Sequence, residues 1–311
     1  MNSWQARFFN AWVRRLVRRE RWGGDERAVA RRARRLFGSP LFIQRLRTFG
    51  LRVEPVRGGG GVRGEWLTPP DAGPGAVLYI HGGGYVSCSP STHRPIAAAL
   101  ARGTGRRVFS PDYRLAPEHR YPAALDDAVA AYEWLLGQGL PPASVSLAGD
   151  SAGGGLVLGT LLRLRDAGRA LPACAVCFSP WTDLAGEGES VAGNDGRCQM
   201  FRPSNVGEFA SAYLGGASPF DPYASPARAD LGGLPPVLLQ VGSTELLLDD
   251  SRRVHAKILE AGGRSELEVY EDIFHCWQML DGIVPEAGEA LRRASLFILR
   301  HTGAEQFQTA A

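Results

Sequence analysis

The stretch Gly149-Asp150-Ser151-Ala152-Gly153 places a serine between two glycines, directly after the apolar run Val145-Ser146-Leu147-Ala148. The residues that follow, 152–164, are small at first and then rich in leucine, as in a buried helix. A strand-to-helix turn this sharp requires glycine on both sides of the serine. The turn exposes the serine hydroxyl at a helix N-terminus, where developing negative charge is stabilised. Alone, the pattern also fits an ordinary loop before a helix.

Strand-like and helix-like segments alternate on both sides of this turn. The expected strands are 76–80, 108–110, 145–148, 173–178, 237–241 and 267–270, and the expected helices are 95–102, 123–137, 152–166, 250–261 and 286–300. Two shorter strands, 51–56 and 62–67, flank four glycines and predict an antiparallel hairpin. The alternation predicts an α/β fold, with a mostly parallel central sheet covered by helices on both faces. Functional groups are then expected at the carboxyl ends of the strands.

Residues 186–228 interrupt this alternation. The segment is rich in Gly, Ser, Pro and Asp and carries scattered aromatic residues, and an insertion of this length in a compact domain is usually a lid or a binding element. We therefore expect one domain, 1–311, whose core spans about 49–185 and 229–311. Its cap comes from the N-terminal helices, about 1–48, and the insertion, about 186–228.

Composition narrows the function classes. No run of 18 or more apolar residues exists, and the N-terminus lacks the apolar region of a signal peptide, which predicts a cytoplasmic protein. The five cysteines are an odd number and indicate reduced thiols. Cys174 and Cys177 have CxxC spacing, but they lie in an apolar strand with no second ligand pair. We therefore expect no metal and no cofactor.

The N-terminal segment is strongly basic. Residues 1–50 hold 13 arginines and three acids, while the whole chain has a net charge of +3. Apolar side chains recur every four residues at Trp4, Phe8, Trp12 and Leu16, with Phe9, Val13 and Val17 beside them, as in an amphipathic helix. We expect this stripe to pack on the body, with peripheral attachment to an anionic membrane as the alternative. No nucleic-acid recognition module accompanies the charge, so nucleic-acid binding is not expected.

A glycine loop, His81-Gly82-Gly83-Gly84-Tyr85, follows the expected strand 76–80. Consecutive glycines let backbone N–H groups converge on one anion, and the expected donors are Gly83, Gly84 and Ala152, the residue after the serine. His81, Gly82 and Asp150 are expected to support this loop. A plain glycine turn is the alternative, and a phosphate loop would need a Lys-Ser/Thr pair that does not follow.

A histidine and an acid follow later in the chain. His275 lies shortly after the strand 267–270, at a carboxyl end beside the serine turn, and is the expected general base. Glu245 is the first acid after the strand 237–241 and is the expected partner of that histidine. Asp249 remains the alternative, although it and Asp250 also suit the first turn of a helix. No metal is needed for this chemistry.

Five ordered blocks carry a resemblance to a known family. They are His81-Gly82-Gly83-Gly84, Asp112-Tyr113-Arg114-Leu115-Ala116-Pro117-Glu118, Tyr121-Pro122-Ala123-Ala124 before Asp126-Asp127, Gly149-Asp150-Ser151-Ala152-Gly153-Gly154, and Ser179-Pro180-Trp181-Thr182-Asp183. The sequence resembles the hormone-sensitive-lipase-like (bacterial family IV) esterases of the α/β-hydrolase superfamily. The resemblance implies Ser151 as nucleophile, His275 as base, and Gly83, Gly84 and Ala152 as the oxyanion hole.

Two positions depart from that family. Its acid is usually aspartate, whereas Glu245 stands here, and Cys276 stands where glycine often follows the histidine. Cys276 lacks a glycine turn, so we do not expect it to act as a nucleophile. The run His275-Cys276-Trp277-Gln278 resembles the lactone-hydrolase-like branch of the family.

The sequence thus predicts a cofactor-free carboxylic ester hydrolase for short- to medium-chain esters. We expect Tyr85, Trp181 and Trp277 to line its substrate pocket. Lactones are an alternative substrate class, and amides would need the same catalytic groups. A ligand-binding protein on the same fold is a third hypothesis, since fold alone does not dictate function. The late strand 267–270 suits a sheet edge and would allow a homodimer.

Overall fold

An eight-stranded sheet forms the centre of the protein in the computed structural model, which describes residues 2–20, 22–38 and 48–303. The strand order is β1-β2-β4-β3-β5-β6-β7-β8. The first two strands, β1 (Arg52–Arg57) and β2 (Arg63–Thr68), form the expected antiparallel hairpin, and β2 pairs antiparallel with β4. The remaining neighbours are parallel: β3 (Ala76–Ile80), β4 (Arg107–Pro111), β5 (Val145–Asp150), β6 (Cys174–Phe178), β7 (Val237–Gly242) and β8 (Ser265–Tyr270).

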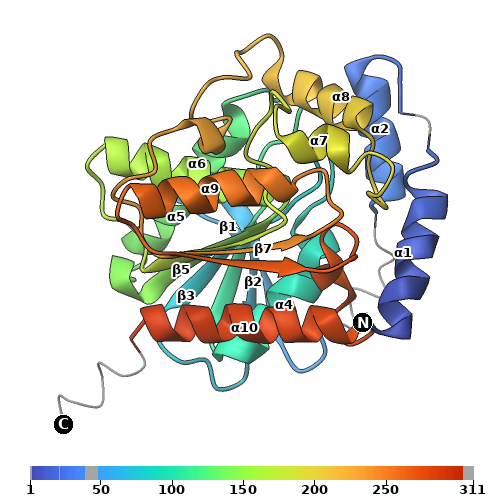
Figure 1. The fold of residues 1–311 in the computed structure, drawn as a ribbon. Coiled ribbons are helices and arrows are strands. Elements are labelled where there is room, and N and C mark those ends of the chain that lie inside the picture. Colours follow the sequence, from blue (N-terminus) through green and yellow to red (C-terminus); the bar gives the residue numbers. More distant parts are fainter. Residues whose placement is uncertain (1, 21, 39–47, 304–311) are drawn as a thin grey trace.

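Helices cover both faces of this sheet (Figure 1). On one face lie α4 (Arg94–Thr104) and α10 (Pro285–His301), and on the other lie α5 (Ala123–Gly137), α6 (Ala152–Asp166) and α9 (Leu248–Glu260). Every residue of β3, β5, β6 and β7 is buried, because parallel strands in such a sheet are covered on both sides. The fold is therefore the α/β-hydrolase architecture that the sequence predicts. Short 3-10 turns span Gly59–Gly61, Pro90–His93, Pro142–Ser144, Pro226–Arg228 and Trp277–Leu280.

The remaining described helices come from the two segments expected to form a cap. They are α1 (Trp4–Leu16), α2 (Glu26–Leu36), α7 (Glu189–Gly193) and α8 (Pro203–Leu214). Helices α2 and α8 pack against each other although they are far apart in the sequence (Figure 1). Part of the expected cap, residues 1, 21 and 39–47, lies outside the described residues, as do residues 304–311 of the expected domain. None of the helices within the described ranges is long and apolar enough to span a bilayer.

The orientation of α1 corrects one sequence prediction. Val13 and Val17 are buried against the body as expected, but the four residues at the spacing of four are largely exposed: Trp4 is 67% exposed, Phe8 56%, Trp12 48% and Leu16 45%. The buried face carries smaller side chains, Ala6, Asn10 and Val13. Polar contacts hold this face to the body, since the Asn2 and Asn10 side-chain amides both donate to the carbonyl of Asp272 at 2.7 Å, and Ser3 donates to Glu286. Small and polar groups let the helix approach closely, and the bulky stripe is left outside.

Candidate active site

Ser151 stands at the turn between β5 and α6. Its backbone has φ 53° and ψ −121°, a strained conformation for a residue with a side chain. The turn also needs glycine beside it, because a Cβ on Gly153 would lie 2.0 Å from the carbonyl oxygen of Ile80. The close approach of β3 and α6 thus explains the second glycine of the motif.

The structure brings Ser151, His275 and Glu245 together. His275 Nε2 lies 2.9 Å from Ser151 Oγ, and His275 Nδ1 lies 2.5 Å from Glu245 Oε2. The acid follows the end of β7 and the histidine follows the end of β8, so both reach the serine from neighbouring carboxyl ends. Glu245 is 1% exposed and His275 4% exposed, so the carboxylate can hold the Nδ1 proton without competition from bulk water.

Asp249, the alternative acid, lies elsewhere. Its Oδ2 accepts from the Ser190 backbone N–H at 2.7 Å, and its Oδ1 forms an ion pair with Arg252 at 3.3 Å. It is in the first turn of α9, where acids are favoured by the helix dipole. The structure therefore brings Glu245, not Asp249, to the histidine.

Ser179 is a positioning residue that the sequence analysis did not single out. Its hydroxyl donates to Glu245 Oε1 at 2.7 Å and accepts from the Cys276 N–H at 3.4 Å. The Gly242 N–H also donates to Glu245 Oε1, at 2.7 Å. Ser179 thereby joins the acid to the loop that carries the histidine. The available signal was its place in the Ser179–Asp183 block, after the buried strand β6.

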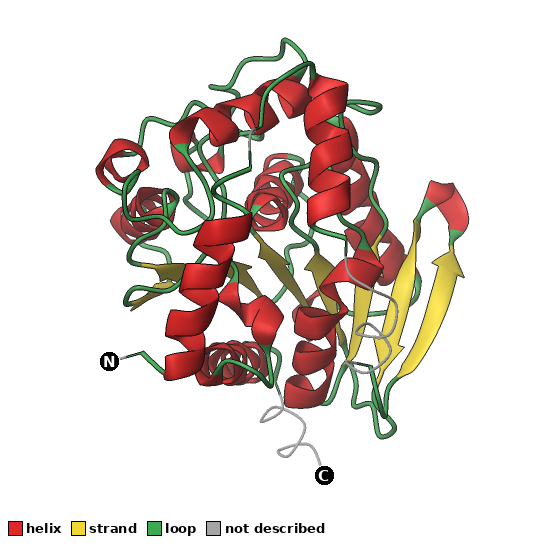
Figure 2. Ribbon diagram, turned by 90° about the vertical axis from the view of Figure 1, so that its right-hand side faces the viewer, coloured by secondary structure: helices red, strands yellow, loops and turns green. Residues whose placement is uncertain are grey.

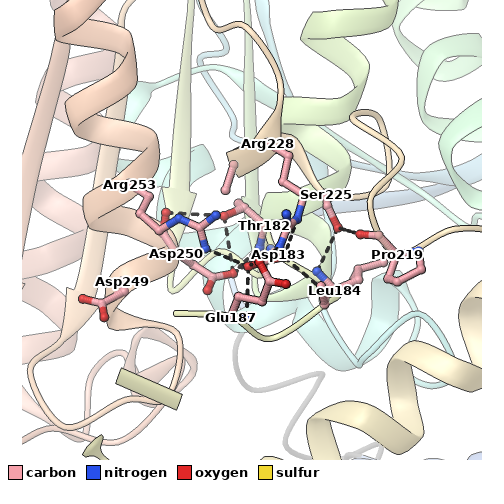
Figure 3. Close-up of polar contacts among 12 residues, drawn as sticks. Thr182, Asp183, Leu184, Glu187, Pro219, Ser225, Arg228, Asp249, Asp250 and Arg253 are labelled. Atoms are coloured by element: carbon pink, nitrogen blue, oxygen red, sulfur yellow. Dashed lines mark hydrogen bonds and ion pairs between the residues drawn. The ribbon is translucent and has the colours of Figure 1, made fainter. Parts of the chain in front are cut away.

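The loop that follows Ser179 is fixed to α9 by a buried polar cluster (Figure 3). Asp250 Oδ2 accepts from the backbone N–H groups of Thr182 and Asp183, at 2.6 and 2.8 Å. Asp183 forms ion pairs with Arg228 at 3.0 Å and with Arg253 at 2.7 Å. Burial raises the pKa of Asp250 to about 7. Burial would also raise the pKa of Asp183, but Arg253 and Arg228 lower it below its usual value.

The glycine loop lies beside the serine and lines the same cavity. Gly83 has φ 109°, and a Cβ there would lie 2.4 Å from the carbonyl oxygen of Ser87, so only glycine fits. Gly82 N–H donates to Asp150 Oδ1 at 3.0 Å, which joins the loop to the serine turn. Ala152 is the first residue of α6, where backbone N–H groups have no partner within the helix.

Asp150 is held by two residues that the sequence analysis did not predict. His93 Nε2 lies 3.2 Å from Asp150 Oδ2, and the Tyr79 hydroxyl donates to Asp150 Oδ1. Burial alone would raise the pKa of Asp150, but His93 and Tyr79 stabilise the charged form and lower it to about 2. The residue before Ser151 is therefore a buried carboxylate that fixes the glycine loop.

His81 is a buried neutral residue. Burial lowers its pKa to about 3, and its ring stacks on Tyr113 at 4.2 Å. Its Nδ1 lies 2.8 Å from the carbonyl oxygen of Gly82. A carbonyl can only accept, so Nδ1 carries the proton and donates to the glycine loop.

A cavity of about 220 Å³ opens over Ser151 and His275. Both cap segments contribute apolar walls, and the lining includes Phe9, Trp12 and Val13 of α1, Phe37 after α2, and Met200, Phe201, Val206 and Phe209 of the insertion. Trp181 is also part of the lining of this cavity. The lining is mostly apolar apart from Ser151, His275 and the contacting pair of His93 and Asp150, so it suits an uncharged substrate.

Tyr85 and Trp277 lie outside that lining, which corrects the prediction for both. Tyr85 stacks on Tyr213 at 3.8 Å between ring centres and is 1% exposed. Trp277 is fully buried and packs against Tyr270. Cys276 does border the cavity, but burial raises the pKa of its thiol well above the ordinary value, so it is protonated at neutral pH. Across the described ranges, no group of three or more His, Cys, Asp or Glu side chains could hold a metal ion.

A serine on a glycine turn, with a histidine and an acid from later strand ends, is typical of α/β-hydrolases. A family model described as the alpha/beta hydrolase fold matches residues 77–279. The chain belongs to this family and, within it, to the hormone-sensitive-lipase-like esterases. It is an enzyme of the serine carboxylesterase class.

Individual relatives agree with this assignment. An acetyl-hydrolase of Streptomyces hygroscopicus is 45% identical over 239 residues, which cover 77% of this chain and 80% of the relative. An esterase of Acinetobacter venetianus is 36% identical over 242 residues, with 78% and 80% covered. The crystal structure of an esterase from the bacterial hormone-sensitive lipase family matches 97% of this chain and 100% of its own, at 40% identity and a TM-score of 0.88.

Proposed function

We propose that this protein hydrolyses short- to medium-chain carboxylic esters with a Ser151-His275-Glu245 triad. The observation that carries the proposal is the continuous set of contacts from Ser151 Oγ through the imidazole to Glu245, at 2.9 and 2.5 Å, at the base of an apolar cavity. A serine hydroxyl needs an adjacent base to become a nucleophile, and His275 Nε2 is within reach of it.

The reaction proceeds in two half-reactions. Ser151 Oγ attacks the ester carbonyl carbon while His275 Nε2 accepts the hydroxyl proton, and Glu245 stabilises the resulting imidazolium. The N–H groups of Gly83, Gly84 and Ala152 donate to the tetrahedral oxyanion. His275 then donates its proton to the leaving alcohol, and an acyl-enzyme remains on Ser151. Water, deprotonated by His275, releases the acid and restores the serine.

The size of the cavity supports the chain-length preference. Its volume of about 220 Å³ lies below the range of about 300–1,000 Å³ typical of sites for drug-sized ligands. One solved neighbour, 36% identical with a TM-score of 0.88, was soaked with p-nitrophenyl butyrate, a short-chain ester. Lactones remain an alternative within the same chemistry, favoured by the His275-Cys276-Trp277-Gln278 run.

A series of p-nitrophenyl esters of increasing acyl length tests this function. We expect the highest kcat/KM for the acetate to hexanoate range and no turnover by Ser151→Ala. Equal hydrolysis by wild type and Ser151→Ala would refute the triad. Wild type with bound but unhydrolysed esters would instead favour the ligand-binding hypothesis. Faster hydrolysis of an isosteric amide or of a lactone than of the open ester would change the substrate class.

A further inference from the structure

Helix α1 turns four large apolar side chains away from the protein. Trp4, Phe8, Trp12 and Leu16 are each between 45% and 67% exposed, and they follow one another at successive turns. A continuous exposed stripe of this kind marks an interaction surface, whereas single exposed apolar residues do not. Figure 2 shows α1, the helix beside the N mark, on the side that faces the viewer.

Arginines share this exposed face. Arg7, Arg15 and Arg19 are exposed and have no ion pair with any residue in the described ranges. Arg14 donates to the carbonyl of Gly196 and Arg18 pairs with Asp195, so these two arginines hold α1 to the insertion. Arg7 and Arg15 therefore lie on α1 with the exposed aromatic side chains, Arg19 follows the C-terminal end of the helix, and α1 has no acid to neutralise these cations.

We propose that α1 docks this protein onto an anionic lipid surface. Helices that lie in a membrane interface typically combine tryptophan, phenylalanine and leucine with unpaired arginine, as α1 does. The long arginine side chains reach the headgroups while the aromatic rings enter the acyl boundary. A second copy of the chain fits this surface less well, because a two-fold contact would bring two sets of unpaired arginines together.

Docking would also place the candidate active site next to the lipid. Phe9 and Val13 of α1 line the cavity over Ser151, and Trp12 belongs both to the exposed stripe and to that lining. An ester dissolved in the membrane would then reach the cavity along the helix that binds the membrane. This consequence rests on the proposed ester hydrolysis, whereas the docking itself does not.

Vesicle sedimentation with the full chain tests the docking. We expect wild type to bind phosphatidylcholine–phosphatidylglycerol vesicles at least about tenfold more tightly than pure phosphatidylcholine. Trp4→Ser/Phe8→Ser/Leu16→Ser should lose at least about tenfold in binding. Arg7→Gln/Arg15→Gln should lower the affinity for anionic vesicles about fivefold per arginine. Added salt should also lower the affinity of the wild type for these vesicles.

A matched control replaces Leu259 and Leu296 with serine, since both are 48% exposed on other helices. This control should bind vesicles as wild type does. All variants should hydrolyse a water-soluble ester at the wild-type rate, which shows that they fold and separates this test from that of the triad. The proposal is overturned if wild type ignores anionic vesicles, or if the triple variant binds them equally well. It is also overturned if wild type is a dimer that the triple variant converts to monomer without any vesicle binding.

Discussion

Replacing Glu245 with glutamine should remove most of the catalytic rate with little change in shape. In the native protein, Glu245 accepts hydrogen bonds from Ser179 Oγ and Gly242 N at 2.7 Å and from His275 at 2.5 Å. Glutamine has only one acceptor oxygen. If its NH₂ group faces His275, the imidazole must carry its proton on Nε2 and can no longer accept from Ser151.

The opposite orientation also leaves an unmatched donor. The NH₂ group would then face the Gly242 N–H, which cannot turn away, in a site where the side chain is 1% exposed. An unsatisfied buried donor costs about 1–3 kcal/mol of stability. A wrong imidazole tautomer typically costs about 10⁴-fold in kcat, equivalent to about 5 kcal/mol of transition-state stabilisation. We therefore expect Glu245→Gln to lower kcat by about 10³–10⁴.

The assay is steady-state hydrolysis of p-nitrophenyl butyrate, with thermal unfolding as a check on the fold. Asp249→Asn is the matched control, because an amide oxygen still accepts from Ser190 and the residue does not contact His275. It should keep the wild-type kcat. If Glu245→Gln keeps more than a tenth of kcat, or if Asp249→Asn loses as much as Glu245→Gln, Glu245 does not hold the imidazole tautomer.

Three further outcomes follow from the site. Ser179→Ala removes one hydrogen bond to the charged Glu245 and should lower kcat about 10- to 100-fold with KM little changed, measured on the same ester. Asp250 has a folded pKa of about 7, above the ordinary carboxyl value, so its contribution to the free energy of unfolding is complete below about pH 4 and is lost as the pH rises through 7. The free energy of unfolding measured in urea should therefore change less with pH over that window for Asp250→Asn than for wild type. The same pH dependence in both proteins would contradict this assignment. The Phe201 ring lies edge-on to the His275 ring, with 5.4 Å between ring centres, and lines the cavity. Phe201→Ala should therefore hydrolyse esters with a longer acyl chain best. If the preferred acyl length in the ester series stays the same, Phe201 does not border the acyl subsite.

The parallel sheet could be predicted well because its signals are local. Continuous apolar runs bounded by glycine and proline mark buried strands, and β3, α5 and α6 have the bounds that the sequence predicts. The serine turn and the glycine loop could be recognised because their glycines are closely spaced in the sequence, although the steric limit on Gly153 comes from Ile80 in another strand. The strands are parallel, so their carboxyl ends meet at one edge of the sheet, and this explains why the functional groups at neighbouring strand ends lie close together.

Features that depend on tertiary contacts could not be predicted. The period of four residues in α1 defines a stripe but not which face meets the protein, and the small face with Asn10 does so. Tyr85 has φ 64°, and its ring stacks on Tyr213 rather than bordering the cavity. Ser179 and His93 act through partners more than 50 residues away, so the sequence does not show which residue either one contacts. The cytoplasmic location, the single-domain division and the homodimer stay predictions.

Covalent labelling of the nucleophile tests the central claim most directly. Wild-type protein is treated with an organophosphonate that carries a short alkyl chain, digested, and analysed by peptide mass spectrometry while residual esterase activity is followed. We predict one phosphonate per chain, on Ser151, formed in step with the loss of activity. Ser151 of the Glu245→Gln variant should be labelled more slowly than Ser151 of the wild type. Loss of activity with the label on another residue, or full activity with Ser151 labelled, would contradict the account.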